Sequence, residues 1–147
     1  MSRTARADHG ALRHDVAVQT KQLRILSTLL LAFAVAQAGL GSGYLEGGGG
    51  LLIAHLTNAF AVLVLTVLSA VLGFAYRRAG GPSWTFYFPL ALVVAAAVQI
   101  ALGFAETRSL HVFWGVLYLC GVTTFCSYTF RALPGRTPRV SVNVSDA

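Results

Sequence analysis

The chain has 147 residues, of which 56% are hydrophobic and only 11% are charged. A soluble domain of this length would need charged faces on its helices. The composition therefore excludes a soluble domain and predicts an integral membrane protein. The net charge of +6 at pH 7 comes from basic residues that flank the apolar stretches. It indicates topology and an attraction to anionic membrane lipids, and it requires no nucleic-acid partner.

The chain opens with a basic segment that leads into the first apolar stretch. Residues 1–22 lack a sustained apolar face, and we expect them to form a mobile cytoplasmic tail outside the bundle. Residues 23–41 are apolar and end in Gln37-Ala-Gly-Leu-Gly41. The glycine-rich loop of residues 41–50 follows, and its composition favours a flexible hinge or lid.

The second apolar stretch, residues 51–76, carries His55 close to its start. The loop after it holds Arg77, Arg78 and a Gly-Gly-Pro turn sequence, so we expect the chain to reverse there.

The second half of the chain repeats this order. Residues 86–105 contain Gln99-Ile-Ala-Leu-Gly103, which has the same Gln-x-x-Leu-Gly spacing as the first stretch. After a short turn, residues 110–130 carry His111 near their start. The two halves therefore look like an internal repeat that delivers one histidine each.

Each apolar stretch is long enough to cross the roughly 30 Å hydrocarbon core of a bilayer at about 1.5 Å per residue. The stretches hold no Asp, Glu, Lys or Arg except Arg24 at the edge of the first. Backbone groups in lipid must be satisfied internally, which leaves helices as the spanning structure, and short connections make neighbouring helices antiparallel. We therefore predict an all-α fold, in which residues 23–131 form an integral membrane antiparallel four-helix bundle built from two repeated helical hairpins related by a pseudo-twofold axis.

Basic residues indicate which side of the membrane each end faces. They precede the first stretch and follow the second and the fourth, whereas Arg108 lies alone on the other side. The positive-inside rule then predicts a multi-pass protein of the bacterial cytoplasmic membrane with both termini inside. The C-terminal tail of residues 132–147, which is polar and contains prolines, would also be cytoplasmic.

One polar residue from each apolar stretch falls at a similar depth, and these residues are Gln37, His55, Gln99 and His111. All four lie within about two turns of the outer surface, at about 1.5 Å per residue. Polar side chains are costly in lipid and normally turn toward the bundle interior. We therefore expect these four to face one another or a common ligand.

Two histidines on different helices can approach a planar haem from opposite sides, so His55 and His111 are candidate axial ligands. Ala59 and Gly115 follow them by one helical turn and would leave gaps for the macrocycle edge. We predict that the two glutamines hydrogen-bond an imidazole or the haem edge. Arg108 lies where a haem propionate would emerge.

Each of these residues also has a structural interpretation. Small residues let membrane helices pack closely, and a histidine or glutamine can simply hydrogen-bond across helices, beside a helix-ending Gly41 or Gly103. Arg108 could be a solvated interface charge near Glu106. This interpretation explains one membrane histidine well, but it explains less well two histidines at one depth after matching motifs, so we favour ligation.

The segments that carry these residues, Gln37-x-x-Leu40-Gly41 with His55 and Gln99-x-x-Leu102-Gly103 with His111, resemble the heme A synthase family. Members of that family consist of two four-helix halves, each with histidines on its second and fourth spans near the outer side. The resemblance covers about one such half, residues 31–130, and implies a half that binds haem b. The chain also resembles small uncharacterised bacterial four-helix membrane proteins of the same layout.

Two departures from that family bear on activity. Its catalytic half carries a glutamate three residues before the second-span histidine and an arginine after it, where this chain has Leu52 and Leu56. Its outer loop often carries a cysteine pair, which the loop of residues 41–50 lacks. The resemblance therefore does not extend to haem hydroxylation.

We expect a b-type cytochrome with one haem near the outer leaflet. Two filled axial positions favour one-electron transfer over oxygen activation, and a quinone or a respiratory or haem-maturation protein would be the partner. An alternative is a cofactor-free small membrane subunit that stabilises a larger complex. A third is a membrane enzyme acting on haem or quinone, for which a homodimer would reproduce the two-half architecture; its only outer carboxylates, Glu46 and Glu106, lie in turns.

Overall fold

The computed structural model describes residues 3–133, with side chains from residue 16 onward. In this range the chain forms helices α1 (Arg3–Leu45), α2 (Leu51–Arg78), α3 (Trp84–Phe104) and α4 (Arg108–Arg131), and it contains no strand. The predicted all-α fold is confirmed.

The helices have the length and composition of membrane spans. Four segments of the described chain, Val16–Leu45 and the whole of α2, α3 and α4, are long and apolar enough to cross a bilayer. Large apolar side chains such as Ile53, Val71 and Val94 lie exposed on the outer surface of the bundle. Such a surface suits lipid rather than water, as a multi-pass membrane protein requires.

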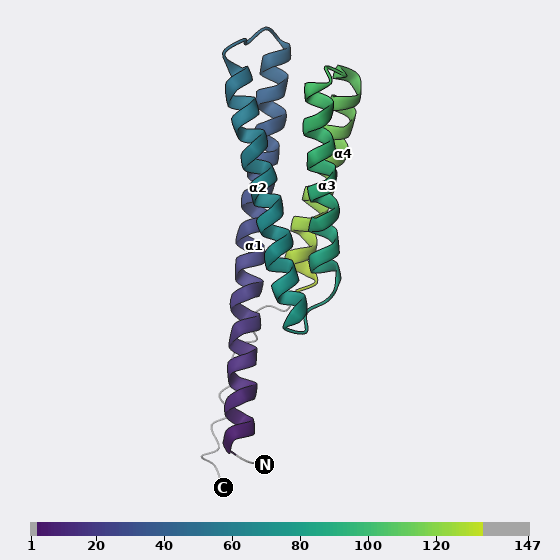
Figure 1. Cartoon of the computed structure of the whole chain (residues 1–147). Helices are drawn as coiled ribbons and strands as arrows, with labels where there is room; N and C mark the ends of the chain where they lie inside the picture. The colour runs from purple at the N-terminus through teal and green to yellow at the C-terminus, as the bar shows by residue number, and fades with distance from the viewer. Residues whose placement is uncertain (1–2, 134–147) are drawn as a thin grey trace.

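The four helices pack in a ring. Helix α1 contacts α2 and α4, helix α3 contacts the same two neighbours, and each helix runs antiparallel to the next along the chain (Figure 1). One end of the bundle carries the connections at residues 46–50 and 105–107, and we call it the histidine end because His55 and His111 lie close to it. The opposite end, with the connection at residues 79–83, is the basic end.

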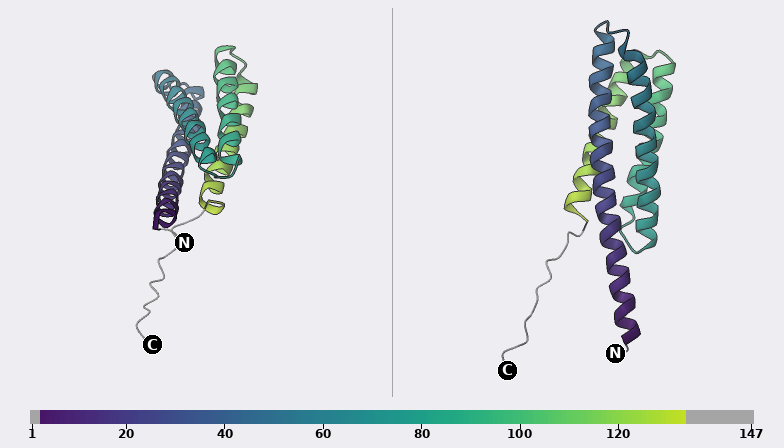
Figure 2. Two further views of the ribbon diagram at one scale, coloured as in Figure 1. Left: turned by 60° about the horizontal axis from the view of Figure 1, so that its bottom comes forward. Right: turned by 90° about the vertical axis from the view of Figure 1, so that its left-hand side faces the viewer.

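Helix α1 is longer than expected. It begins at Arg3 and has 43 residues, which corresponds to about 65 Å at 1.5 Å per residue, so it projects beyond the other helices (Figure 2). The predicted N-terminal tail, residues 1–22, is helical from Arg3 onward and continues into the helix of the first span, which begins at Val16. Once a span has nucleated a helix, propagation is cheap through a segment that has no proline and many strong helix formers. Most of the predicted C-terminal tail, residues 134–147, lies outside the described residues.

Polar side chains join the two hairpins in the basic half of the bundle. The Ser27 and Thr129 hydroxyls are 3.0 Å apart between α1 and α4, and the Tyr118 hydroxyl reaches across the bundle to the Thr66 hydroxyl at 2.7 Å. Arg24 donates hydrogen bonds to the carbonyls of Thr129, at 3.1 Å, and Leu133, at 3.0 Å. These contacts bury groups that would otherwise be unsatisfied in lipid, so they hold the basic half closed.

Helices α2 and α3 cross closely at Gly73. A Cβ added there would collide with the carbonyl oxygen of Thr85, whose hydroxyl is 3.3 Å from the Gly73 carbonyl oxygen. Pro89, one turn further along α3, has no N–H to donate to the Thr85 carbonyl. A bare glycine surface therefore meets a carbonyl that Pro89 leaves without its usual helical donor, at a contact between the two hairpins.

The two hairpins diverge toward the histidine end, where α1 and α2 stay together and α3 and α4 stay together (Figures 1 and 2). Among residues 16–133, the side-chain hydrogen bonds of this half run within a hairpin, between α1 and α2 or between α3 and α4. At the level of the histidines, each hairpin is therefore held together by its own side-chain hydrogen bonds.

Candidate functional site

The four residues of the predicted polar layer form two matching pairs, one in each hairpin. The Gln37 side-chain amide nitrogen on α1 is 3.1 Å from Nε2 of His55 on α2. The Gln99 amide nitrogen on α3 is 3.2 Å from Nε2 of His111 on α4. An amide nitrogen can only donate, so in each pair Nε2 of the imidazole accepts the glutamine hydrogen bond with its lone pair.

The tautomer of His111 is fixed independently by its other ring nitrogen. Nδ1 lies 3.0 Å from the backbone carbonyl oxygen of Gln99, and a carbonyl only accepts, so Nδ1 carries the proton. Metal-binding histidines have this same arrangement, in which one ring nitrogen donates to a carbonyl and the other presents its lone pair.

The glycine of each repeated motif makes room for the histidine of the next helix. A Cβ on Gly41 would lie 3.0 Å from Cε1 of His55, and a Cβ on Gly103 would lie 3.1 Å from Cε1 of His111. Both distances are tighter than ordinary packing. Gly41 does not end its helix, because α1 continues to Leu45, so the helix-ending role considered for it is wrong.

The two imidazoles meet across the diagonal of the bundle. Their ring centroids are 6.1 Å apart and their planes are inclined by 61°. Two imidazole nitrogens that bind one metal from opposite sides at about 2 Å would place their ring centres roughly 6 Å apart. The separation therefore fits a shared metal, provided that each Nε2 exchanges its glutamine for that metal.

The repeat extends to a residue on each helix that sequence reasoning did not pair. Asn58, three residues after His55, donates from Nδ2 to the Phe33 carbonyl at 3.0 Å. Trp114, three residues after His111, donates from its indole nitrogen to the Ala95 carbonyl at 2.9 Å. Phe33 and Ala95 each lie four residues before the glutamine of their helix. The equal offsets from histidine and glutamine could have revealed that Asn58 and Trp114 are equivalent, although asparagine and tryptophan are chemically dissimilar.

The two halves differ because α4 has a tryptophan, Trp114, at the position where α2 has an asparagine, Asn58. Asn58 Nδ2 also donates to the side-chain oxygen of Gln37 at 2.6 Å. An indole has a single N–H, which Trp114 uses on a carbonyl, and the side-chain oxygen of Gln99 is buried without a partner. Gln37 is therefore anchored at both ends of its amide, whereas Gln99 is anchored at one.

Of the two small residues predicted to leave gaps, Gly115 has its space filled by another side chain. A Cβ added to Gly115 would lie 2.9 Å from the Gln99 amide nitrogen, so this glycine makes room for that glutamine. Ala59 is half-buried on α2. A macrocycle edge would reach the Gly115 surface only when the Gln99 side chain moves.

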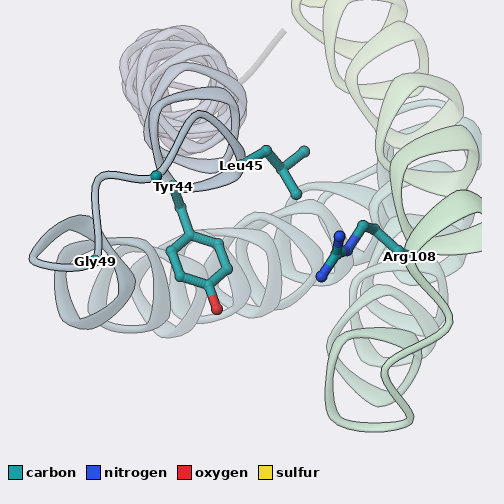
Figure 3. Close-up of a pocket in the computed structure, with 5 residues that line it drawn as sticks. Tyr44, Leu45, Gly49 and Arg108 are labelled. Carbon is teal, nitrogen blue, oxygen red and sulfur yellow. The ribbon is translucent and has the colours of Figure 1, made fainter.

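Arg108 lies at the rim of the site, one turn before His111. It lines a pocket of about 280 Å³ at the histidine end, together with Tyr44, Leu45, Gly47 and Gly49 (Figure 3). Its guanidinium extends toward Leu45 and Tyr44 on the other hairpin (Figure 3). The pocket is thus lined by both hairpins and offers an anionic group one positive charge.

The ligand set narrows the kind of metal centre. In the described part of the chain, no group of three or more His, Cys, Asp or Glu side chains comes together. A structural zinc site needs about four protein ligands, whereas a haem brings its own nitrogens and asks the protein for one or two axial ligands. Two imidazoles thus fall short of the ligand set of a structural zinc ion, whereas their number equals that of the axial ligands of a haem.

No protein-family model matches the chain, and neither a curated protein nor a solved structure is significantly similar to it. The function is therefore inferred from the geometry of His55, His111 and their glutamine partners.

Proposed function

We propose that the protein is a bis-histidine, b-type cytochrome of a bacterial cytoplasmic membrane, which binds one haem between its two hairpins. The observation that carries this proposal is the pair of imidazoles of His55 and His111, with ring centroids 6.1 Å apart, one from each hairpin. Their Nε2 atoms face a donor, so the lone pairs that iron would use are present.

The surrounding residues have distinct tasks in this proposal. The Gln99 carbonyl orients His111 through Nδ1, and the Gln37 and Gln99 side chains hold the two imidazoles in place before loading. Arg108 would offer its guanidinium to a propionate at the rim. Ala59 and, once the Gln99 side chain has moved, Gly115 would border the macrocycle. The haem, when bound, would supply one-electron redox chemistry.

The distribution of charge supports an orientation. Arg24, Arg77, Arg78 and Arg131 lie at the basic end, whereas Arg108 lies at the histidine end. The positive-inside rule then places the basic end and both termini in the cytoplasm and the haem near the outer leaflet. Its electron partner would be a quinone or a respiratory or haem-maturation protein, and the resemblance to a haem-b-binding half of heme A synthase favours the last.

Absorption spectroscopy tests the proposal. We expect the detergent-purified protein from haem-sufficient cells to show sharp b-type bands in its reduced-minus-oxidised spectrum. His55→Ala and His111→Ala should each abolish the bands, because each removes an axial ligand. His14→Ala, which removes a histidine far from the site along α1, serves as the matched control and should keep the bands. A well-folded wild type without haem would overturn the proposal.

A second candidate function is a cofactor-free subunit of a larger membrane complex. The observation that favours it is that both Nε2 atoms already have glutamine partners, as interhelical hydrogen bonds in membranes often do. Under this alternative, the wild type lacks haem, and both histidine variants lose thermal stability.

A further inference from the structure

Two arginines and three aromatic rings form a cluster on the surface of the bundle at the basic end. Arg77 and Arg78 are the last two residues of α2, and Phe74 lies one turn before them. Phe86 and Tyr87 lie in the first turn of α3. The ring centroids of Phe74 and Phe86 are 5.3 Å apart, and those of Phe86 and Tyr87 are 5.1 Å apart. The three rings, which we call the aromatic row, therefore form one apolar surface that joins α2 to α3.

Both guanidinium groups lie over the aromatic row. Cζ of Arg77 is 4.9 Å from the ring centroid of Tyr87 and 5.9 Å from that of Phe86. Cζ of Arg78 is 5.7 Å from the ring centroid of Phe74. Arg77 also donates from Nη1 to the Tyr87 hydroxyl at 3.1 Å. These contacts hold the two cations in place, while most of their N–H groups stay available for a further acceptor.

The two cations have no acidic partner among the described side chains. Within residues 16–133 the only carboxylates are Glu46 and Glu106, and both lie in connections at the histidine end. Arg77 and Arg78 are exposed. Two neighbouring positive charges repel each other, so an anion that binds to both would lower their electrostatic energy.

The position of the cluster indicates which anion would bind. Phe74 and Tyr87 are 43% and 53% exposed, on a surface that suits lipid. Arg77 and Arg78 stand at the end of the α2 span, where arginines and aromatic side chains lie among lipid headgroups. A phospholipid can place its phosphate on the guanidinium groups and an acyl chain along the rings. A free phosphate ion could use only the charges, so the aromatic row favours a lipid.

From these contacts we propose that Arg77 and Arg78, held over the aromatic row, bind the phosphate of an anionic phospholipid. The planar fork of a guanidinium matches two phosphate oxygens, and each such hydrogen bond is strengthened by charge. The site differs from the general attraction between basic residues and an anionic membrane, because the rings fix where the charges lie. It involves neither His55 nor His111, so it does not depend on haem binding.

Titration of the lipid-free protein in detergent with phosphatidylglycerol tests the proposal, with bound lipid counted by native mass spectrometry. We expect the wild type to bind this lipid saturably, and more tightly than phosphatidylcholine, whose headgroup carries a compensating positive charge. Arg77→Gln should weaken the affinity for phosphatidylglycerol by about ten-fold or more, the size of one lost charge-assisted hydrogen bond. Arg78→Gln is a second variant with the same expected direction.

Tyr87→Leu removes no charge, yet it should also weaken binding, because Arg77 loses both the ring beneath it and the hydroxyl that accepts its hydrogen bond. An affinity equal to that of the wild type would contradict the part given to the aromatic row and overturn the proposal.

Arg131→Gln is the matched control for net charge. Arg131 is an exposed arginine in the last turn of α4, and its guanidinium lies over no aromatic ring among the described side chains. This variant should lower the affinity by less than about two-fold, as exposed charges usually do. Equal losses in Arg77→Gln and Arg131→Gln would overturn the proposal, since binding would then follow net charge alone. Equal affinities of the wild type for the two lipids would overturn it too.

Discussion

Single residues set the geometry of the polar layer formed by Gln37, His55, Gln99 and His111, and one of these residues is a glycine next to the layer. Gly41 and Gly39 lie two positions apart on α1, yet a Cβ on Gly41 would press on the His55 ring at 3.0 Å while a Cβ on Gly39 would meet nothing within 4 Å. The same helix therefore contains a site residue and an ideal control.

We predict that Gly41→Ala weakens haem binding by roughly ten-fold, because an imidazole displaced by a few tenths of an ångström loses its alignment with the iron. Gly39→Ala should leave haem binding unchanged and raise thermal stability slightly, since alanine favours a helix over glycine by about 1 kcal/mol. Haem titration and thermal unfolding of both variants in detergent measure these effects. Equal haem affinities in the two variants would contradict the role given to Gly41.

The candidate site was partly predictable at this scale. The Gln-x-x-Leu-Gly repeat and the depth of the histidines identified four side chains, and the structure joins them as two pairs. The sequence could not show that the motif glycines touch the imidazoles, because that contact joins two helices on either side of a turn. Trp114 also escaped notice, since its equivalence to Asn58 depends on one shared hydrogen bond rather than on chemical similarity.

At the scale of the elements, the crossing of α2 and α3 decides how the hairpins fit. The apolar stretches correctly predicted that these helices exist and are antiparallel. The close contact between them depends on Gly73, which faces the Thr85 carbonyl, and on Pro89, which has no N–H to donate to that carbonyl. A hydropathy pattern does not contain that information. The N-terminal extension of α1 was missed for a related reason, because a polar helix beyond the membrane has no apolar face to reveal it.

We predict that Gly73→Ala destabilises the bundle by about 2 kcal/mol or more, because the added methyl group would collide with the backbone at Thr85 and force α2 from α3. The loss should appear as a lower midpoint of thermal unfolding in detergent. Gly39→Ala again provides the comparison for the effect of alanine alone. An unchanged midpoint in Gly73→Ala would show that the helices are not packed this closely.

At the scale of the whole molecule, contacts between α1 and α4 close the ring. Arg24 near the start of the membrane-spanning part of α1 donates to carbonyls at the end of α4, and Ser27 meets Thr129 one turn further on. The sequence predicted the four-helix bundle, but it gave Arg24 only as a charge at the edge of a span. Its partners are backbone atoms more than a hundred residues away, and no local pattern indicates them.

We predict that Arg24→Ala lowers stability by about 2 kcal/mol, since it leaves buried carbonyls without a charged donor. Arg77→Ala removes the same charge from the same end of the molecule, where the guanidinium packs over the exposed Tyr87 ring and donates to its hydroxyl. That variant should cost less than about 1 kcal/mol, as exposed charge contacts usually do. Urea unfolding of both variants in detergent compares them, and similar losses would contradict a special role for Arg24.

The ring of helices has a consequence for biosynthesis. A ribosome delivers α1 and α2 long before α4, so Gln37, Asn58 and His55 can adopt their arrangement while the rest of the chain is still being made. Arg24 and Ser27 must wait for residues 129–133, which are made after the rest of the four helices. Each hairpin can therefore enter the membrane with its own histidine already hydrogen-bonded, and the two imidazoles first face each other when the second hairpin joins the first.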